Sequence, residues 1–323
     1  MFYITPPTVP MLKPLRPIIL LAFVVGCAAK PPEPPTAAQI AAPHRVVVDE
    51  PRPNVPVDVN LDLRRTAFVG LSPAGLLIGA VMTAGDAVVN SITESNRTAR
   101  RDELAARLGE TGPIASDFAR QFNEAFKQQL AGVPALRVER FDQAPRGAQV
   151  QLGEGAGLQI YRDVVLTTDG RFLVARATTM HTVGEGAARR SIVRYAAAFS
   201  RPVNAPSEEE AVARWTADDS RLIREQAGPL AEELASVVRL AVFSTQPLDI
   251  ERMPSLEIPS TGVSLLVGTA PNGREGAFWA ETRSLGYEVS REGSRVVTVS
   301  ALGRERNRWT WISMPAYLVQ AFR

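Results

Sequence analysis

The sequence predicts an α+β fold, in which an antiparallel sheet meander carries helices on one face and a small β-rich C-terminal subdomain follows. Three observations predict it. Strand-like runs follow one another at 158–166, 171–179 and 191–199, helical apolar periodicity lies on both sides of them, and further β-like runs lie beyond residue 259. With 45% apolar residues, the chain can bury a sizeable core.

The helix before the strands is indicated by an apolar stripe. Its members lie four residues apart and are Ile114, Phe118, Phe122, Phe126 and Leu130. Side chains at this spacing share one face of an α-helix. Gly132 and Pro134 end the pattern. We expect this aromatic stripe to belong to the core and not to a ligand site.

The three strand-like runs are joined by short turns, which predicts that neighbouring strands pair antiparallel. Asp169-Gly170 between the first two is a hairpin signal. After the third strand, Ser207 and Glu210 have the spacing of a capping box, so a second long helix is expected to begin there. Pro229 is expected to kink or restart that helix, because proline lacks the amide hydrogen.

The chain beyond Gln246 reads as a separate β-rich subdomain at 246–323. Prolines at 247, 254 and 259 mark the boundary, and the strand-like runs are 263–267, 277–282, 296–300 and 309–313. Trp279, Trp309 and Trp311 are candidate contacts to a ligand or a partner. The alternative is that these rings fill the core of a domain that has few other large side chains.

An uncharged stretch at 66–85 contains the small-residue pair Gly75 and Gly79. One interpretation is a segment that inserts into a membrane or pairs with another helix. Pairing between two copies of the chain would make the protein a homo-oligomer. The other is a buried strand and a core helix packed closely on another backbone. We favour the second, since the apolar helical part is short.

The first residues resemble the signal peptide and lipobox of bacterial lipoproteins. Lys13 and Arg16 provide a basic region, an apolar run extends from 18 to 25, and Val24-Val25-Gly26-Cys27 closes it. The resemblance implies cleavage between Gly26 and Cys27 and acylation of Cys27. Several acyl chains together hold a protein stably at a membrane. The alternative is an ordinary secretory signal at 1–26 with Cys27 a bystander.

The resemblance also implies a location. Ala28 follows the cysteine, where an aspartate would retain an enterobacterial lipoprotein in the inner membrane. We therefore expect an outer-membrane, lipid-anchored protein that faces the periplasm. Residues 27–56 are rich in proline and read as a semi-rigid tether, about 90 Å long at most in polyproline form. Within it, Val46-Val47-Val48 is a candidate edge strand. The α+β domain is expected at 57–245.

Composition limits the partners and the chemistry. Once the leader with its two basic residues is removed, 34 basic residues face 34 acidic ones, which argues against nucleic-acid binding. Cys27 is the only cysteine, so no disulfide and no multi-cysteine metal site can form, and no cofactor is expected. The two histidines are His44, in the expected tether, and His181, in or near a strand. No catalytic residue is predicted.

Three functions remain open. The favoured one is an envelope lipoprotein that acts without catalysis as an interaction, assembly or accessory factor for other envelope proteins. The second is a periplasmic module that binds peptidoglycan glycan or a small ligand, which exposed C-terminal tryptophans would favour. The third is a carboxylate-based hydrolase, whose candidate residues are Glu208 to Glu210 and Asp218-Asp219, although acidic residues at helix starts also stabilise the helix dipole.

Overall fold

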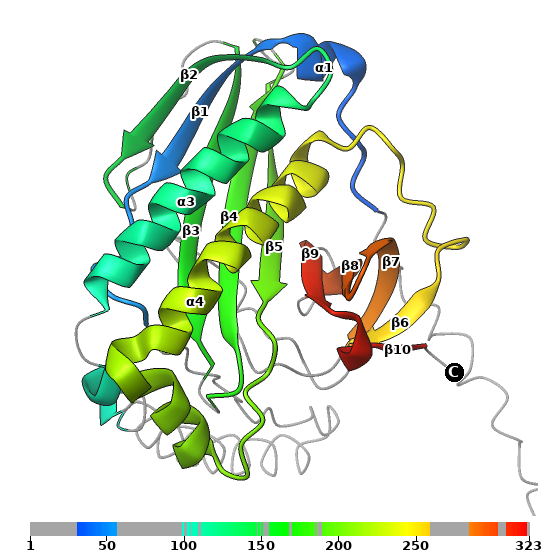
Figure 1. Cartoon of the computed structure of the whole chain (residues 1–323). Coiled ribbons are helices and arrows are strands. Elements are labelled where there is room, and N and C mark those ends of the chain that lie inside the picture. The colour runs from blue at the N-terminus through cyan, green and yellow to red at the C-terminus, as the bar shows by residue number, and fades with distance from the viewer. Residues whose placement is uncertain are drawn as a thin grey trace, which may run out of the picture.

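The computed structural model describes residues 31–56, 111–146, 155–167, 170–184, 189–258, 284–302 and 308–321, together with parts of 99–108 and 148–150 and residue 186. These residues form one mixed sheet of ten strands and two long helices (Figure 1). The general α+β class predicted from the sequence is confirmed. In the part of the chain that the structure describes, no helix is both long and apolar enough to cross a membrane.

The helices are α1 (Ala37–Ala41), α3 (Gly112–Ala131), α4 (Glu208–Phe243) and the 3-10 turn η2 (Ala316–Leu318). The strands are β1 (Pro43–Asp49), β2 (Arg137–Ala144), β3 (Ala156–Leu166), β4 (Leu173–Val183), β5 (Arg190–Phe199), β6 (Ser255–Ile258), β7 (Ser284–Glu292), β8 (Arg295–Leu302), β9 (Arg308–Pro315) and β10 (Gln320–Ala321). Their order across the sheet is β10-β6-β7-β8-β9-β5-β4-β3-β1-β2.

The antiparallel meander is only part of this sheet. Strands β3, β4 and β5 pair antiparallel as predicted. However, β1 pairs parallel with both β2 and β3, and β5 pairs parallel with β9. Parallel neighbours need a long crossover, and the chain between β1 and β2 contains α3, while the chain between β5 and β9 contains α4. The sheet is therefore mixed.

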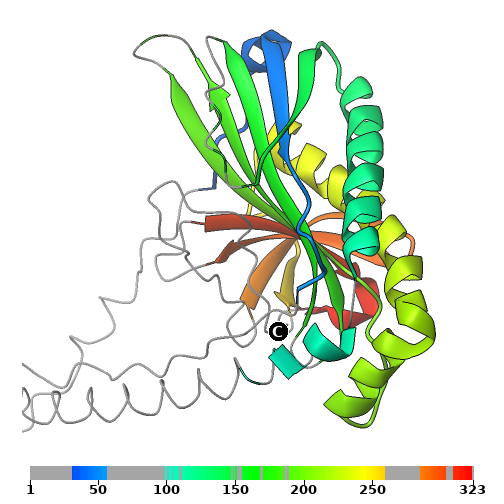
Figure 2. The ribbon, with the colours of Figure 1, turned by 90° about the vertical axis from the view of Figure 1, so that its left-hand side faces the viewer.

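The two long helices lie on the same face of the sheet (Figure 2). The aromatic stripe of α3 faces that sheet: Phe118, Phe122 and Phe126 are almost fully buried, as predicted. Trp215 of α4 is fully buried, and its indole nitrogen donates to the Gly170 carbonyl at 2.5 Å. A second buried cluster, which includes Val165, Val174 and Ile312, lies on the opposite side of the strands.

Two details of α4 separate prediction from structure. Ser207 caps the helix as predicted, since its hydroxyl accepts from the Glu210 amide at 3.2 Å. The helix does not restart at Pro229. Its backbone leaves helical geometry at Ala217–Ser220 instead, where Asp218, Asp219 and Ser220 have left-handed φ values. Short polar side chains tolerate that region.

The C-terminal strands do not form a sheet of their own. Strands β6 to β10 continue the central sheet through the pairing of β9 with β5. The predicted turn after Glu292 is present, and Gly293 takes the positive φ of 54° that a tight turn requires there. The runs 263–267 and 277–282 lie outside the described residues.

The segment expected to be a tether is part of the fold. Val46, Val47 and Val48 are buried in β1, which lies between β2 and β3. Further on, the Val55 amide donates to the Thr111 hydroxyl at 2.8 Å, which ties the segment to the start of α3. Proline-rich composition indicated an extended chain, but an extended chain can equally add to the interior of a sheet when consecutive side chains are apolar, as the three valines are.

Candidate functional site

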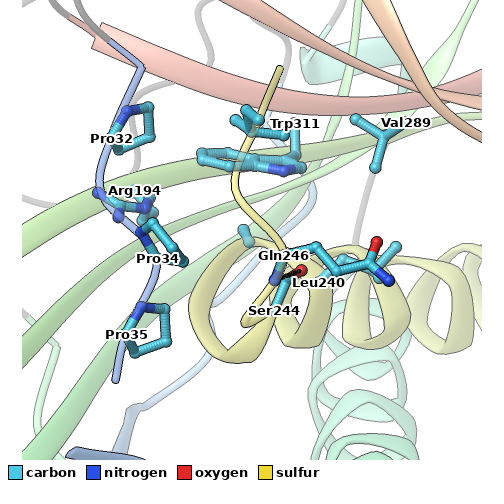
Figure 3. Close-up of a pocket in the computed structure, with 11 residues that line it drawn as sticks. Pro32, Pro34, Pro35, Arg194, Leu240, Ser244, Gln246, Val289 and Trp311 are labelled. Carbon is cyan, nitrogen blue, oxygen red and sulfur yellow. Dashed lines mark hydrogen bonds between the residues drawn. The ribbon is translucent and has the colours of Figure 1, made fainter. Parts of the chain in front are cut away.

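A groove beside the C-terminal end of α4 holds the first described residues of the chain. Figure 3 shows three prolines of this segment, Pro32, Pro34 and Pro35, lying across from Trp311. The other lining residues are Arg194, Leu240, Ala241, Ser244, Gln246, Leu248 and Val289. The space left between them is about 30 Å³, enough for one or two water molecules. The protein's own N-terminal segment therefore forms one wall of this groove, and we call the groove the linker-docking site.

Trp311 and Arg194 form the floor of this site. They come from the neighbouring strands β9 and β5, whose parallel pairing sets Trp311 opposite Ala196. Both side chains are buried, at 4% and 7% exposure. The guanidinium of Arg194 lies 5.6 Å from the centre of the Trp311 ring, within the range of a cation–π contact.

Arg194 also holds the linker by a polar contact. It donates a hydrogen bond to the backbone carbonyl of Glu33 at 3.2 Å, and the Glu33 carboxylate lies 3.8 Å from Arg190. Burial, together with the nearby charge of Arg190, lowers the pKa of Arg194 to about 10. Arg194 is still charged at neutral pH, so this bond to the carbonyl is charge-assisted.

The prolines suit this kind of contact. An extended proline-rich chain presents its rings and carbonyls outward and loses little conformational entropy when it docks on an aromatic surface. Thr36, directly after Pro35, keeps extended angles of φ −72° and ψ 158° and then caps α1. Ile40 of α1 is buried and continues the attachment.

A pair of buried histidines lies at the same end of α4. Nε2 of His44 in β1 lies 3.0 Å from Nε2 of His181 in β4. The two rings stack at 5.3 Å, and Phe243 at the end of α4 contacts both. His44 was expected in a tether; instead it is fully buried, because β1 belongs to the sheet.

The contacts of the pair define its protonation. Nδ1 of His44 lies 2.6 Å from the Ala42 carbonyl and must donate to it, so Nε2 of a neutral His44 accepts from Nε2–H of His181. Burial, together with the proximity of His44 and Arg194, lowers the pKa of His181 to about 3. Burial also lowers the pKa of His44. Both rings are neutral at pH 7.

A cluster of buried charges fastens the other end of β1. The Asp49 carboxylate accepts from the Arg162 amide at 3.0 Å and from the Arg162 guanidinium at 2.8 Å. Arg162 reaches on to the side chain of Asn123 in α3 at 3.1 Å. Asp163 pairs with Arg176 at 2.7 Å and with Arg52 at 3.1 Å. These carboxylates bind arginines of the sheet and the N-terminal segment.

No family model, curated protein or solved structure matches this chain. Among the described residues, no three His, Cys, Asp or Glu side chains come together as metal ligands would.

The predicted site residues are only partly covered by the structure. Gly26, Cys27 and Trp279 lie outside the described residues, and so does the segment with Gly75 and Gly79. Trp309 and Trp311 are both buried. Trp311 lines the linker-docking site together with the protein's own N-terminal segment.

Sequence reasoning missed Arg194 and the histidine pair. Arg194 carries no motif, and its role depends on the β5–β9 pairing of strands more than 100 residues apart. His44 and His181 are the only two histidines of the chain, which was the one available signal that they could meet. Their contact requires β1 to lie inside the sheet, whereas the proline-rich composition around β1 indicated a tether.

Replacing Arg194 with methionine should weaken the attachment of the linker to the domain. Arg194→Met keeps much of the apolar bulk but loses the charge-assisted bond to Glu33, a bond of about 1.5–3 kcal/mol. We expect amide exchange in residues 36–42 to rise about tenfold by mass spectrometry. The matched control is Arg190→Met, whose contact with Glu33 is exposed and should matter little. Equal exchange in both variants would exclude Arg194 as the holding residue.

Proposed function

We propose that this chain is a lipid-anchored lipoprotein of the bacterial envelope, and that it acts as an interaction or assembly factor close to the membrane surface. The lipobox-like residues Val24 to Cys27 support the anchor. The observation that carries the rest is the docked linker, because it sets how far the folded domain can lie from an acylated Cys27.

The distance follows from covalent geometry. Pro31, the first described residue, is four positions after Cys27. Four residues span at most about 14 Å, whatever their conformation. A free tether through Pro56 would have allowed about 90 Å. With the linker docked, the end of the domain that carries Trp311 lies next to the lipid surface.

An interaction role is supported by how the polar groups of the described residues are used. Trp309 and Trp311 are buried and present no free ring to a glycan. Asp218 and Asp219, candidates for a hydrolase, are exposed and form ion pairs with Arg221 and Arg224. The buried carboxylates and histidines connect β1 to the rest of the fold. The site is built to hold a chain segment.

The anchor is tested first. Mass spectrometry of the mature protein should find acyl chains on an N-terminal Cys27, and the protein should enter the detergent phase when extracts are separated with a phase-forming detergent. Cys27→Ala should move it to the aqueous phase, because several buried acyl chains supply the membrane affinity. An intact leader, or cleavage elsewhere with no acyl mass, would contradict the proposal.

The interaction role is tested by cross-linking in intact cells. The tagged full-length protein is cross-linked, purified, and its partners identified, with two comparison variants. Cys27→Ala removes the anchor, and a ten-residue Gly/Ser insertion between Ala29 and Lys30 keeps the anchor but lifts the docked domain. An envelope-protein partner should be lost in the first variant and weakened in the second. Partners unchanged by both would show that membrane proximity has no role.

A further inference from the structure

The sheet ends in an open edge at β2. In the described part of the chain, β1 is the one strand that pairs with β2, which terminates the strand order (Figure 1). Residues 137–140 of β2 are all exposed, and Val138, at 39%, is among the few large apolar side chains at the surface. The opposite edge is formed by the two-residue strand β10. An eight-residue edge strand offers its backbone amides and carbonyls to another strand.

Symmetry restricts how such an edge can pair with its own copy. Residues directly opposite each other in an antiparallel pair project to the same face of the sheet. In a pair of identical strands related by a twofold axis, opposite positions must therefore differ by an even number. One residue then lies on the axis, opposite itself.

The sequence of β2 selects that residue. An axis at Glu139, Arg140 or Asp142 would place a charge directly opposite the same charge, which is destabilising. An axis nearer either end of the strand would pair few residues. An axis at Phe141 avoids both problems and pairs the seven residues 138–144.

The Phe141 register is complementary along its length. It sets Arg140 of each copy opposite Asp142 of the other copy, so two opposite-charge pairs form. Val138 meets Ala144 of the second copy, and Glu139 meets Gln143. We infer that β2 pairs antiparallel with β2 of a second copy of this chain, about a twofold axis at Phe141.

The surroundings of β2 fit this pairing on both faces. Phe141 lies on the helix-covered face, half-buried against the core, with the Lys127 ammonium 4.7 Å from its ring centre. On the other face, Asp142 contacts Arg45 at 2.9 Å and Arg140 at 3.2 Å. In the dimer these groups form one continuous row of alternating charges across the two copies.

Disulfide trapping in intact cells tests the register. Single cysteines are placed at positions 139, 141 and 143 of the full-length chain, and oxidation is followed on non-reducing gels. Only Phe141→Cys lies opposite itself; single cysteines at 139 or 143 lie about 13 Å from their copies, too far for a disulfide. We expect about fivefold more dimer at 141 than at either neighbour.

A second variant guards against a fold weakened by loss of Phe141. The exposed pair Glu139→Cys with Gln143→Cys should give the dimer when combined and not singly, since these positions face each other across the interface. The unmutated protein shows how much disulfide-linked dimer forms through Cys27 alone. A strong dimer band from it would contradict acylation of Cys27 but would not contradict the β2 interface.

Charge reversal gives the matched comparison. In the Phe141→Cys chain, Arg140→Asp places like charges opposite each other and should reduce the dimer about fivefold. Arg137→Asp makes the same charge change just outside the seven paired residues and should leave the yield unchanged. Equal yields at all positions, no dimer with either trapping design, or capture of a different protein at position 141 would each overturn the inference.

Discussion

Replacing Arg162 with methionine should lower the free energy of unfolding by about 3–5 kcal/mol at pH 7.5. Asp49 and Arg162 are buried at 3% and 1% exposure, and their charges meet at 2.8 Å. Burial raises the pKa of Asp49 to about 6, so the carboxylate is ionised at this pH. Methionine fills much of the volume of Arg162 but carries no charge, so the Asp49 carboxylate is left buried without the guanidinium that contacts it.

The matched control is Arg120→Met, the same substitution at an exposed helix position whose partner is Asp117. Asp117 contacts Arg120 at 3.4 Å with 65% of its side chain exposed, and water screens such pairs. We expect a change below about 1 kcal/mol there. Urea denaturation of both variants and the unmutated chain measures the difference. Similar losses in the two variants would mean that the buried cluster contributes no more than a surface pair.

Acid should destabilise the protein through the histidine pair. His181 has a pKa of about 3 in the folded state against 6.5 as the ordinary value. The unfolded chain therefore binds more protons between these values, and stability present above pH 6.5 is lost as the pH falls toward 3. Between pH 7.5 and 5.0 this amounts to about 2 kcal/mol. His44, whose pKa burial also lowers, adds to the loss.

The effect is measured as a difference between two chains. His181→Gln keeps a donor for His44 but cannot be protonated, so it should lose about 2 kcal/mol less between pH 7.5 and 5.0. Asp49 acts with the opposite sign, because its raised pKa adds stability as the pH falls through 6. Asp49 is present in both chains, and its contribution cancels in the comparison. Parallel pH profiles for the two chains would show that His181 does not carry the acid sensitivity.

The two clusters act at the two ends of β1. The histidine pair joins its start to β4 and α4, and the charge cluster joins its end to β3 and α3. The same strand follows the docked prolines, so the chain from Pro31 to Pro56 is attached to the domain along its length. In the proposed function, this attachment keeps the domain at a fixed, short distance from the lipid anchor.

Local patterns were enough to determine much of this protein from its sequence. The apolar stripe of α3, the Ser207 cap of α4 and the consecutive strands β3 to β5 were all predicted, because each depends on spacing within one segment. The resemblance of Val24 to Cys27 to a lipobox is equally local, and it remains a prediction.

Only the tertiary structure decided where distant segments meet. Proline content described residues 31–56 as extended, and it took the parallel pairing of β1 with β2 and β3 to make them part of the sheet. The contact of His44 with His181 and the arginines around Asp49 follow from that placement, and the pairing of β9 with β5 sets Trp311 beside Arg194 in the linker-docking site. These contacts join residues that lie about 100 or more positions apart in the chain. A pattern of spacing within one segment cannot predict such contacts.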